Sequence, residues 1–248
     1  MTAIYALWLR QLKRYVRSRS RIVGSLGQPL LYLLALGFGF GPIFQRSGQG
    51  NYIQFIAAGV IGMTVLFTSM FSGIELIWDR QFGLLKATLV APVPRLNIML
   101  GRTCGGATVA CIQGIIVFCA CLLVGFRPSR LETLPLALVF VALIGLCFTA
   151  LGTAVASLLD DFQGFQLVMN FLVMPIYFLS GALYPLGTAG GALEQIARLD
   201  PLSYGVDGLR ASFGGVSHFG IATDLGVLSV IALVFLGIGA YLFSRIRL

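Results

Sequence analysis

Glu75 and Asp79 are the two residues whose types and spacing best fit chemistry inside a membrane. They are four positions apart, so a helix would place both carboxylates on one face, near the end of an apolar stretch. A carboxylate at that depth is costly in lipid, which makes it a candidate functional group. The alternative is an interfacial residue neutralised by a base such as Arg80 or Arg102, and the pattern favours this second interpretation.

The other reactive side chains form no recognisable catalytic site in the sequence. The five cysteines all lie inside apolar stretches without a C-x-x-C pair, which is typical of cysteines that pack as small hydrophobic residues. His218 is the only histidine, and we interpret it as interfacial instead of as a proton relay. No nucleophile–base pair, metal-ligand cluster or phosphate-binding G-x-x-x-x-G-K-[ST] loop occurs. We therefore predict no catalytic residue, no metal site, no cofactor in this chain and no ATP hydrolysis by it.

Six long apolar stretches must position these residues. The chain of 248 residues is 58% hydrophobic and only 10% charged, with a mean hydropathy of +0.93. Each stretch has about the 20 residues that a helix needs to cross a bilayer, where a bare backbone cannot be hydrogen-bonded by lipid. We predict an all-α integral membrane protein, one domain over residues 1–248, with six transmembrane helices. They cover residues 22–44, 52–78, 104–126, 134–159, 165–183 and 221–243.

The positive charge orients these helices. If the N-terminus is cytoplasmic, twelve of the seventeen Lys and Arg residues lie on the inside and five on the outside. We therefore predict that both termini are cytoplasmic. The net charge of +8 is then explained by orientation and contact with lipid headgroups, and not by nucleic acid.

The N-terminal segment 1–21 is predicted to be an amphipathic helix at the membrane interface. Ile4, Trp8, Leu12 and Tyr15 recur at helical spacing, and basic residues flank this stripe. An apolar stripe with a basic flank is typical of a helix that lies flat on an anionic leaflet. A calmodulin-type target helix is the alternative.

The cytoplasmic loop 79–95 contains a second short amphipathic pattern. Leu84, Leu85 and Leu89 mark one or two helical turns, which Pro92 and Pro94 would stop. This pattern fits a surface helix that contacts a cytoplasmic partner, and it fits an interfacial linker without a partner equally well.

The outer segment 184–220 is too polar to span the membrane and too apolar for a plain loop. Two half-hydrophobic helical patterns flank Pro201. We predict a re-entrant helical hairpin, whose backbone at membrane depth would have to be covered by protein or water. An amphipathic lid on the outer surface is the alternative.

Three stretches together resemble the membrane subunit, or permease, of type-2 ABC transporters, the group of drug-resistance, nodulation-factor and polysaccharide exporters. The first is the basic surface helix ahead of the first span. The second is IWDRQFGLLKATLVAPVPRLNIMLGR, which is similar to the family's loop with an acidic–basic pair, then Gly-[Thr/Leu]-Leu, then Leu and finally Pro-[Val/Leu]-x-Arg. The third and most specific is FLSGALYPL followed by LEQIARLDPLSYGVDGLR. Asp200 stands where the family often has Asn, and Leu84 where Thr is common.

This resemblance implies an ATP-driven exporter in the bacterial cytoplasmic membrane. It would contain two permeases, expected to be a homodimer, and two copies of a cytoplasmic ATPase subunit that holds the ATP and magnesium. The loop would be a coupling helix whose Leu84, Leu85 and Leu89 enter the ATPase. The residues implied in coupling are Asp79, Arg80, Gly83, Leu84, Leu85, Lys86, Leu89 and Pro92. The outer gate would contain Ser180, Gly181, Tyr184, Pro185, Pro201, Tyr204 and Arg210.

The resemblance also implies a substrate path between the two permeases, lined mainly by the second and fifth spans. Its residues would be Phe67, Phe71, Glu75, Phe171, Tyr177 and Phe178, although aromatic side chains also serve ordinary helix packing. They suit an amphipathic, lipid-like, drug-like or glycan substrate. An ion-coupled secondary transporter or a membrane-embedded lipid-modifying enzyme is the alternative, but we find neither a charged midplane nor clustered catalytic residues.

Overall fold

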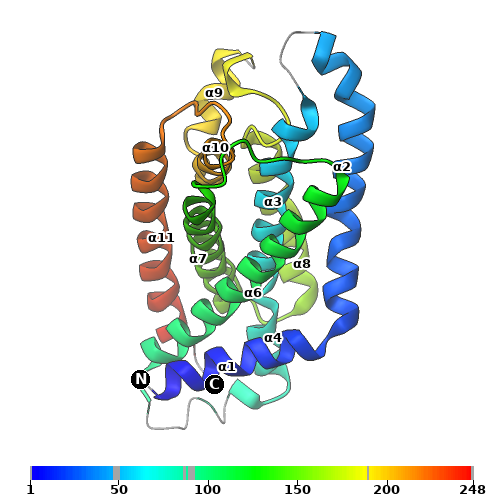
Figure 1. Ribbon diagram of the computed structural model, residues 1–248. Coiled ribbons are helices and arrows are strands. Elements are labelled where there is room, and N and C mark those ends of the chain that lie inside the picture. The colour runs from blue at the N-terminus through cyan, green and yellow to red at the C-terminus, as the bar shows by residue number, and fades with distance from the viewer. Residues whose placement is uncertain (1, 47–50, 86–87, 89–92, 189, 247–248) are drawn as a thin grey trace.

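The computed structural model describes residues 2–46, 51–85, 88, 93–188 and 190–246. The described elements are helices, as the sequence predicts (Figure 1). They are α1 (Thr2–Arg17), α2 (Arg19–Arg46), α3 (Tyr52–Phe71), α4 (Ile74–Gln81), α6 (Arg95–Val124), α7 (Leu134–Leu158), α8 (Phe162–Leu179), the 3₁₀ turn η1 (Leu186–Thr188), α9 (Gly191–Ala197), α10 (Pro201–Ser212) and α11 (Ile221–Ser244).

The described part of the chain contains six helices that are long and apolar enough to cross a membrane, which confirms the predicted number of spans. The spans are Ile22–Arg46, Tyr52–Gln81, Arg95–Val124, Leu134–Leu158, Phe162–Leu179 and Ile221–Ser244. The third begins at Arg95, nine residues before the predicted position 104. These first turns of α6 stay helical because α1 packs along them, and Arg95 donates to the carbonyl of Ile246 at the end of α11 (3.2 Å).

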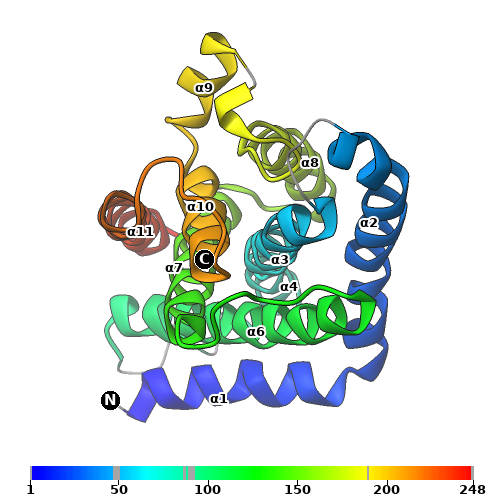
Figure 2. The same cartoon turned by 45° about the horizontal axis from the view of Figure 1, so that its top comes forward.

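α1 lies across one end of the bundle, at a steep angle to most of the other helices and alongside α6 (Figures 1 and 2). Glycines on α6 allow this close approach, because a Cβ at Gly101 would lie only 3.1 Å from the Cα of Ile4. Trp8 on α1 adds a hydrogen bond from its indole nitrogen to Thr108 on α6 (3.0 Å). Close helix packing through small residues is typical of membrane bundles.

α3 is the central helix of the chain. In its most apolar stretch 72% of the residues are buried, against 17% for α2 and for α11. It contacts α2, α6, α7, α8 and α10, and Figure 2 shows it between α7 and α2.

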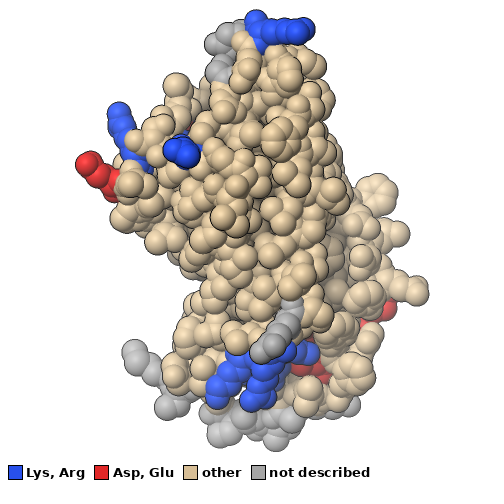
Figure 3. All heavy atoms as spheres, turned by 45° about the vertical axis from the view of Figure 1, so that its right-hand side comes forward, with Lys and Arg blue, Asp and Glu red and all other residues tan. Residues whose placement is uncertain are grey.

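The charged side chains on the face in Figure 3 gather at the two ends of the molecule. Between them lies a broad uncharged zone, as expected where a protein faces lipid hydrocarbon.

Candidate functional site

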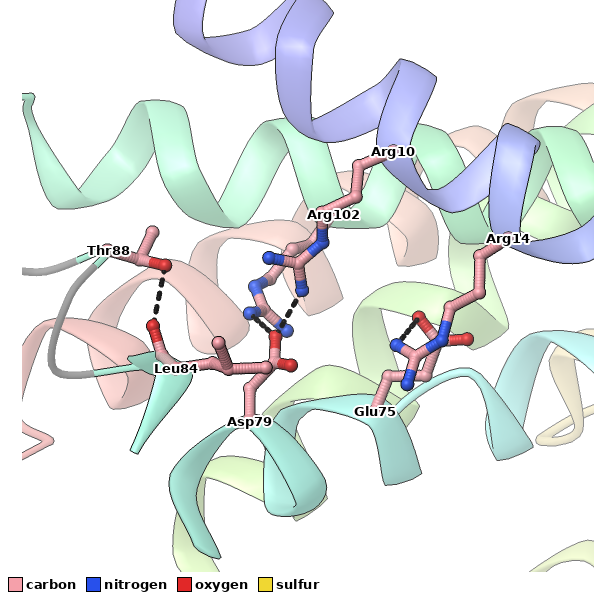
Figure 4. Close-up of polar contacts among 7 residues, drawn as sticks. All are labelled: Arg10, Arg14, Glu75, Asp79, Leu84, Thr88 and Arg102. Carbon is pink, nitrogen blue, oxygen red and sulfur yellow. Dashed lines mark hydrogen bonds and ion pairs between the residues drawn. The ribbon is translucent and has the colours of Figure 1, made fainter. Parts of the chain in front are cut away.

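Asp79 joins three helices at the end of the bundle where α1 lies, which we call the inner end because the charge pattern predicts that it is cytoplasmic. It lies near the end of α4, and its side chain is 2% exposed. Arg10 from α1 and Arg102 from α6 both donate to the same oxygen, Oδ2 (Figure 4). Arg102 is also buried, so each of these two charges depends on the other for its stabilisation.

Glu75 forms a second link between the same elements. It points from α4 toward α1 on the same face as Asp79, as the four-residue spacing predicts (Figure 4). Its carboxylate lies 3.5 Å from the guanidinium of Arg14 on α1. Of the bases that the sequence suggested for this pair of carboxylates, Arg102 pairs with Asp79, whereas the ion pair described for Glu75 uses Arg14 of α1.

Arg80 points to a different part of the protein. It donates to the carbonyl of Leu159 (2.9 Å) and pairs with Asp160, just after α7. Asp160 is largely exposed, so this contact ties α4 to the α7–α8 turn without burying a second charge pair.

The coupling leucines differ in exposure. Leu84 is 52% exposed and Phe82 before it is 76% exposed, whereas Leu85 is completely buried in the protein's own core. Gly83 between them has a φ of +74°, a left-handed conformation that favours glycine. Thr88 donates to the carbonyl of Leu84 (2.9 Å), as in one turn of helix (Figure 4). Leu84 is therefore the leucine available to a partner, and Leu85 is not.

Three further coupling residues cannot be placed. Lys86, Leu89 and Pro92 lie outside the described residues. Next to this turn, a hollow between α1 and Leu84 is lined by four basic side chains of α1 and by Asp79. The lining residues are Arg10, Lys13, Arg14, Arg17, Ser18, Ser20, Asp79 and Leu84.

At the opposite end of the bundle, which we call the outer end, α10 packs against α3, α7 and α11. Most of its residues from Leu202 to Leu209 are buried. Glycines again allow the contact, since a Cβ at Gly208 would overlap the ring of Phe140, and one at Gly205 would lie 2.5 Å from Ile144. Similarly, a Cβ at Gly59 on α3 would overlap the carbonyl of Ala182.

Arg210 connects α10 to the turn that follows α8. It donates to the carbonyl of Gly181 (3.1 Å), and its guanidinium lies 3.9 Å from the ring centre of Phe55 on α3. Burial lowers the pKa of Arg210 to about 10. Gly181 has a φ of +71°, and Ser180 before it donates to the carbonyl of Tyr177 (2.8 Å).

Asp200 and Pro201 start α10. The Asp200 carboxylate accepts from the amide of Leu202 (2.9 Å), and Pro201 occupies the first helical position. Burial raises the pKa of Asp200 to about 7. Tyr204 donates to the carbonyl of Arg198 (2.8 Å), so it ties α10 to the end of α9.

The two remaining outer residues lie in the turn before η1. Tyr184 makes a long contact with the carbonyl of Leu179 (3.5 Å). Pro185 lines an outward-facing pocket that also includes Asp207 and Arg210.

Asp207 is a functional candidate that the sequence reasoning missed. Its buried carboxylate accepts from the amides of His218 and Phe219 and from the hydroxyl of Ser217, at 2.8–3.0 Å. It thus holds the turn between α10 and α11. Asp207 belongs to the LDPLSYGVDGLR stretch, but a single residue in a pattern does not reveal which distant amides it will bind.

The aromatic path residues divide into two groups. Phe171 and Phe178 lie seven residues apart on α8 and are 77% and 45% exposed. Phe67 and Phe71 stack on each other on α3, and Phe71 contacts Phe165 of α8. Tyr177 is buried and packs edge-on against Tyr32 of α2. The structure therefore brings α3 and α8 together but directs Tyr177 away from any open surface.

Among the residues described here, no group of three or more His, Cys, Asp or Glu side chains could hold a metal ion. The polar side chains described above connect helices to one another at both ends of the bundle: Asp79 and Glu75 at the inner end, and Asp207 and Arg210 at the outer end.

Comparison with known proteins gives a consistent set of similarities. Residues 2–213 match the model of a family described as ABC-2 type transporter. Nodulation protein J of Rhizobium leguminosarum bv. viciae is 28% identical over 232 residues, which cover 92% of this chain and 89% of the relative. Nodulation protein J of Rhizobium meliloti is 29% identical, with 92% and 88% covered. The putative transport permease ycf38 of Porphyra purpurea is 30% identical and covers 98% of this chain and 88% of its own length.

Proposed function

Because this chain belongs to the ABC-2 type transporter family, we propose that it is the membrane-spanning permease of an exporter driven by two copies of a separate cytoplasmic ATPase. Its relatives are named as transport permeases and as nodulation proteins. The substrate would be an amphipathic molecule of lipid-like, drug-like or glycan type, moved outward across the bacterial cytoplasmic membrane. Both termini would lie on the cytoplasmic side. ATP and magnesium would bind to the ATPase subunits, and nucleic acid would play no part.

The observation that carries this proposal is the buried ionic link at Asp79. The exposed Leu84 lies five residues beyond Asp79, and Asp79 is held by Arg10 and Arg102 from two other helices. Because these contacts connect α4 to α1 and α6, a movement of Leu84 by the ATPase would also move α1 and α6. The permease needs no chemistry of its own under this mechanism, only a stiff connection and an interface with two states.

The surroundings of Leu84 suit a partner with acidic residues. The hollow beside it is lined by four basic side chains of α1. Complementary charge would align an ATPase surface against this end, while Phe82 and Leu84 would supply apolar contacts.

The outer end supports an exit that opens by separation of packed helices. We propose that α9 and α10 form the re-entrant segment and that Arg210 holds it against the turn at Gly181. Opening would require this contact and the glycine contacts of α10 to separate. Interfaces of this kind have two discrete arrangements instead of a continuous range.

Polar residues on α8 support a second copy of the permease. Gln166 and Asn170 are exposed on this span, next to the exposed Phe171. Polar side chains in a span normally face protein or a water-filled path instead of lipid. We propose that α8 faces a second copy of the chain and that the substrate passes between the two.

The test of this proposal is the Leu84→Asp variant, co-expressed with the partner ATPase subunit. We expect ATPase stimulation and transport to fall at least tenfold, because a charge would replace an apolar contact at the centre of a small interface. Leu96→Asp is the matched control, since Leu96 is also 52% exposed and lies at the same end of the molecule. Normal stimulation in Leu84→Asp, or an equal loss in both variants, would contradict the coupling role.

The Leu85→Asp variant would not test the proposed contact with the ATPase separately from the stability of the fold. Leu85 is completely buried, so a carboxylate there would destabilise the fold as well as any interface. We expect this variant to lower the amount of membrane-inserted protein.

A further inference from the structure

A cleft between α2 and α3 is not used by the coupling or the outer contacts. It has a volume of about 230 Å³ and is lined by the first turns of α2 and the last turns of α3, which the predicted orientation places in the inner half of the membrane. In Figure 2, α2 stands at the edge of the bundle, beside α3 and next to the end of α1. The lining residues are Tyr15, Gly24, Ser25, Gln28, Pro29, Met63, Thr64, Phe67, Thr68, Phe71 and Gln113.

Gln113 brings an unused hydrogen-bond donor to this cleft. Its side chain on α6 is 0% exposed. Tyr15 of α1 donates to its oxygen Oε1, but its nitrogen Nε2 has no partner within the described structure. A buried amide N–H without a partner costs about 1–3 kcal/mol, so such groups normally have a ligand or water.

Pro29 leaves an unused acceptor on the opposite wall. It lies inside α2 and has no N–H, so the carbonyl of Ser25 one turn earlier cannot receive the usual helical bond from it. Ser25 and Pro29 both line the cleft. The hydroxyl of Ser25 is already used, because it donates to the carbonyl of Ile22 (2.9 Å).

The cleft therefore combines a donor and an acceptor without charge. All of its described lining residues are neutral, which does not favour a phosphate or an ammonium group. A hydroxyl or a secondary amide can accept from Gln113 and donate to Ser25 at the same time. Phe67 and Phe71 at the same cleft would contact an apolar chain attached to that group.

We infer that this cleft binds the hydroxyl- or amide-bearing polar group of a neutral amphiphile that enters sideways from the inner leaflet. The inference rests on the proposed export function and narrows its substrate class. Among lipid-like molecules it selects those with sugar, glycerol or N-acyl groups over those whose headgroups have only charged or accepting atoms.

Photolabelling of the purified permease tests this inference without the ATPase. The protein is placed in phosphatidylcholine nanodiscs with an alkyl maltoside that carries a diazirine in its chain, and labelled positions are found by mass spectrometry. We expect labelling within residues 63–71, displaced by excess dodecyl maltoside and not by excess short-chain phosphatidylcholine, whose headgroup has no hydrogen-bond donor. Because no nucleotide is present, a failure of ATPase coupling would leave this result unchanged.

Two variants remove one hydrogen-bonding group each. Gln113→Leu removes the donor, and Pro29→Ala restores the N–H that occupies the Ser25 carbonyl while improving the helix. Each should weaken displacement by dodecyl maltoside roughly three- to tenfold, the usual effect of one lost hydrogen bond. Gln54→Leu is the control, since it makes the same substitution at the outer end of α3 and should change nothing.

Three results would overturn the inference. The first is labelling that is displaced equally by short-chain phosphatidylcholine, which would indicate an ordinary lipid site. The second is unchanged displacement in both Gln113→Leu and Pro29→Ala. The third is labelling spread over the lipid-facing surface without a maximum at residues 63–71.

Discussion

The inner and outer ends of this permease are held together by different forces. At the inner end, charged side chains from α1, α4 and α6 meet in the buried pair of Asp79 and Arg102 and its neighbours. At the outer end, α10 is held mainly by glycine contacts and by hydrogen bonds to backbone groups. Separating the helices of the inner end should therefore cost more free energy than separating α10 from its neighbours at the outer end.

This difference fits the proposed mechanism, in which the ATPase moves the inner end and the exit opens at the outer end. Separating Asp79 from its two arginines would leave buried charges unpaired, which costs several kcal/mol. Separating α10 from its neighbours would lose close packing and single hydrogen bonds, each with a cost of about 1 kcal/mol. We therefore expect the inner end to move as one body and the outer end to change its packing.

The largest predicted effect comes from Asp79→Ala. It leaves the buried Arg102 without its carboxylate, so we expect a loss of about 3–5 kcal/mol in stability. The midpoint of thermal unfolding in detergent, followed by tryptophan fluorescence, measures this loss. The two tryptophans of the chain, Trp8 and Trp78, lie on α1 and α4 at this end.

Asp160→Ala is the control for that prediction. Asp160 also pairs with an arginine, but its side chain is 89% exposed, so its loss should cost less than about 1 kcal/mol. If Asp160→Ala were as destabilising as Asp79→Ala, the buried link would not be the source of inner stability.

The second prediction concerns the outer packing. In Gly208→Ala, the new methyl group would overlap the ring of Phe140, and we expect a loss of about 1–3 kcal/mol. Gly226→Ala on α11 has open space around the new methyl group and should be neutral or slightly stabilising. Equal midpoints for the two variants would mean that α10 does not sit against Phe140 as described.

The smallest predicted effect is that of Asp200→Asn. Burial raises the pKa of Asp200 from 3.8 to about 7, so the folded protein binds this proton more tightly than the unfolded chain. The resulting stability is complete below pH 3.8 and is lost as the pH rises through 7. Asparagine keeps an acceptor for the Leu202 amide and cannot ionise, so it should add about 1–2 kcal/mol at pH 8 and little at pH 4.

The difference between wild-type and Asp200→Asn midpoints, measured from pH 4 to pH 8, isolates this group. A difference that does not change with pH would show that Asp200 is charged at all of these values. Because Asp200 caps α10, the same measurement reports on the stability of the outer segment.

The spans could be predicted from the sequence because bilayer thickness alone requires about 20 apolar residues in a row. The shared face of Glu75 and Asp79 followed for a similar reason, since helical spacing is a local property. The ion-pair partners of these two carboxylates could not be predicted in the same way. Arg10 and Asp79 are 69 positions apart, and no local pattern indicates that α1 will cross α4.

The sequence pattern also could not predict which of two neighbouring apolar residues is exposed. Leu84 and Leu85 are equally hydrophobic, yet one is half exposed and the other is buried. The half-apolar pattern of residues 202–213 fitted both a surface lid and an inserted helix, because amphipathicity does not indicate how much of a helix its neighbours cover. Such differences depend on tertiary packing, which overrides local pattern.

The position of α10 has a consequence for how the protein is made. α10 packs against α11, where Leu228 lies next to Gly205. The Asp207 carboxylate on α10 also accepts hydrogen bonds from the amides of His218 and Phe219, just before α11. A ribosome releases α10 before α11, so α10 cannot complete its packing until α11 has been inserted. A nascent chain that stops before α11 would leave the apolar side of α10 uncovered, and membrane proteases would be able to recognise it as unfinished.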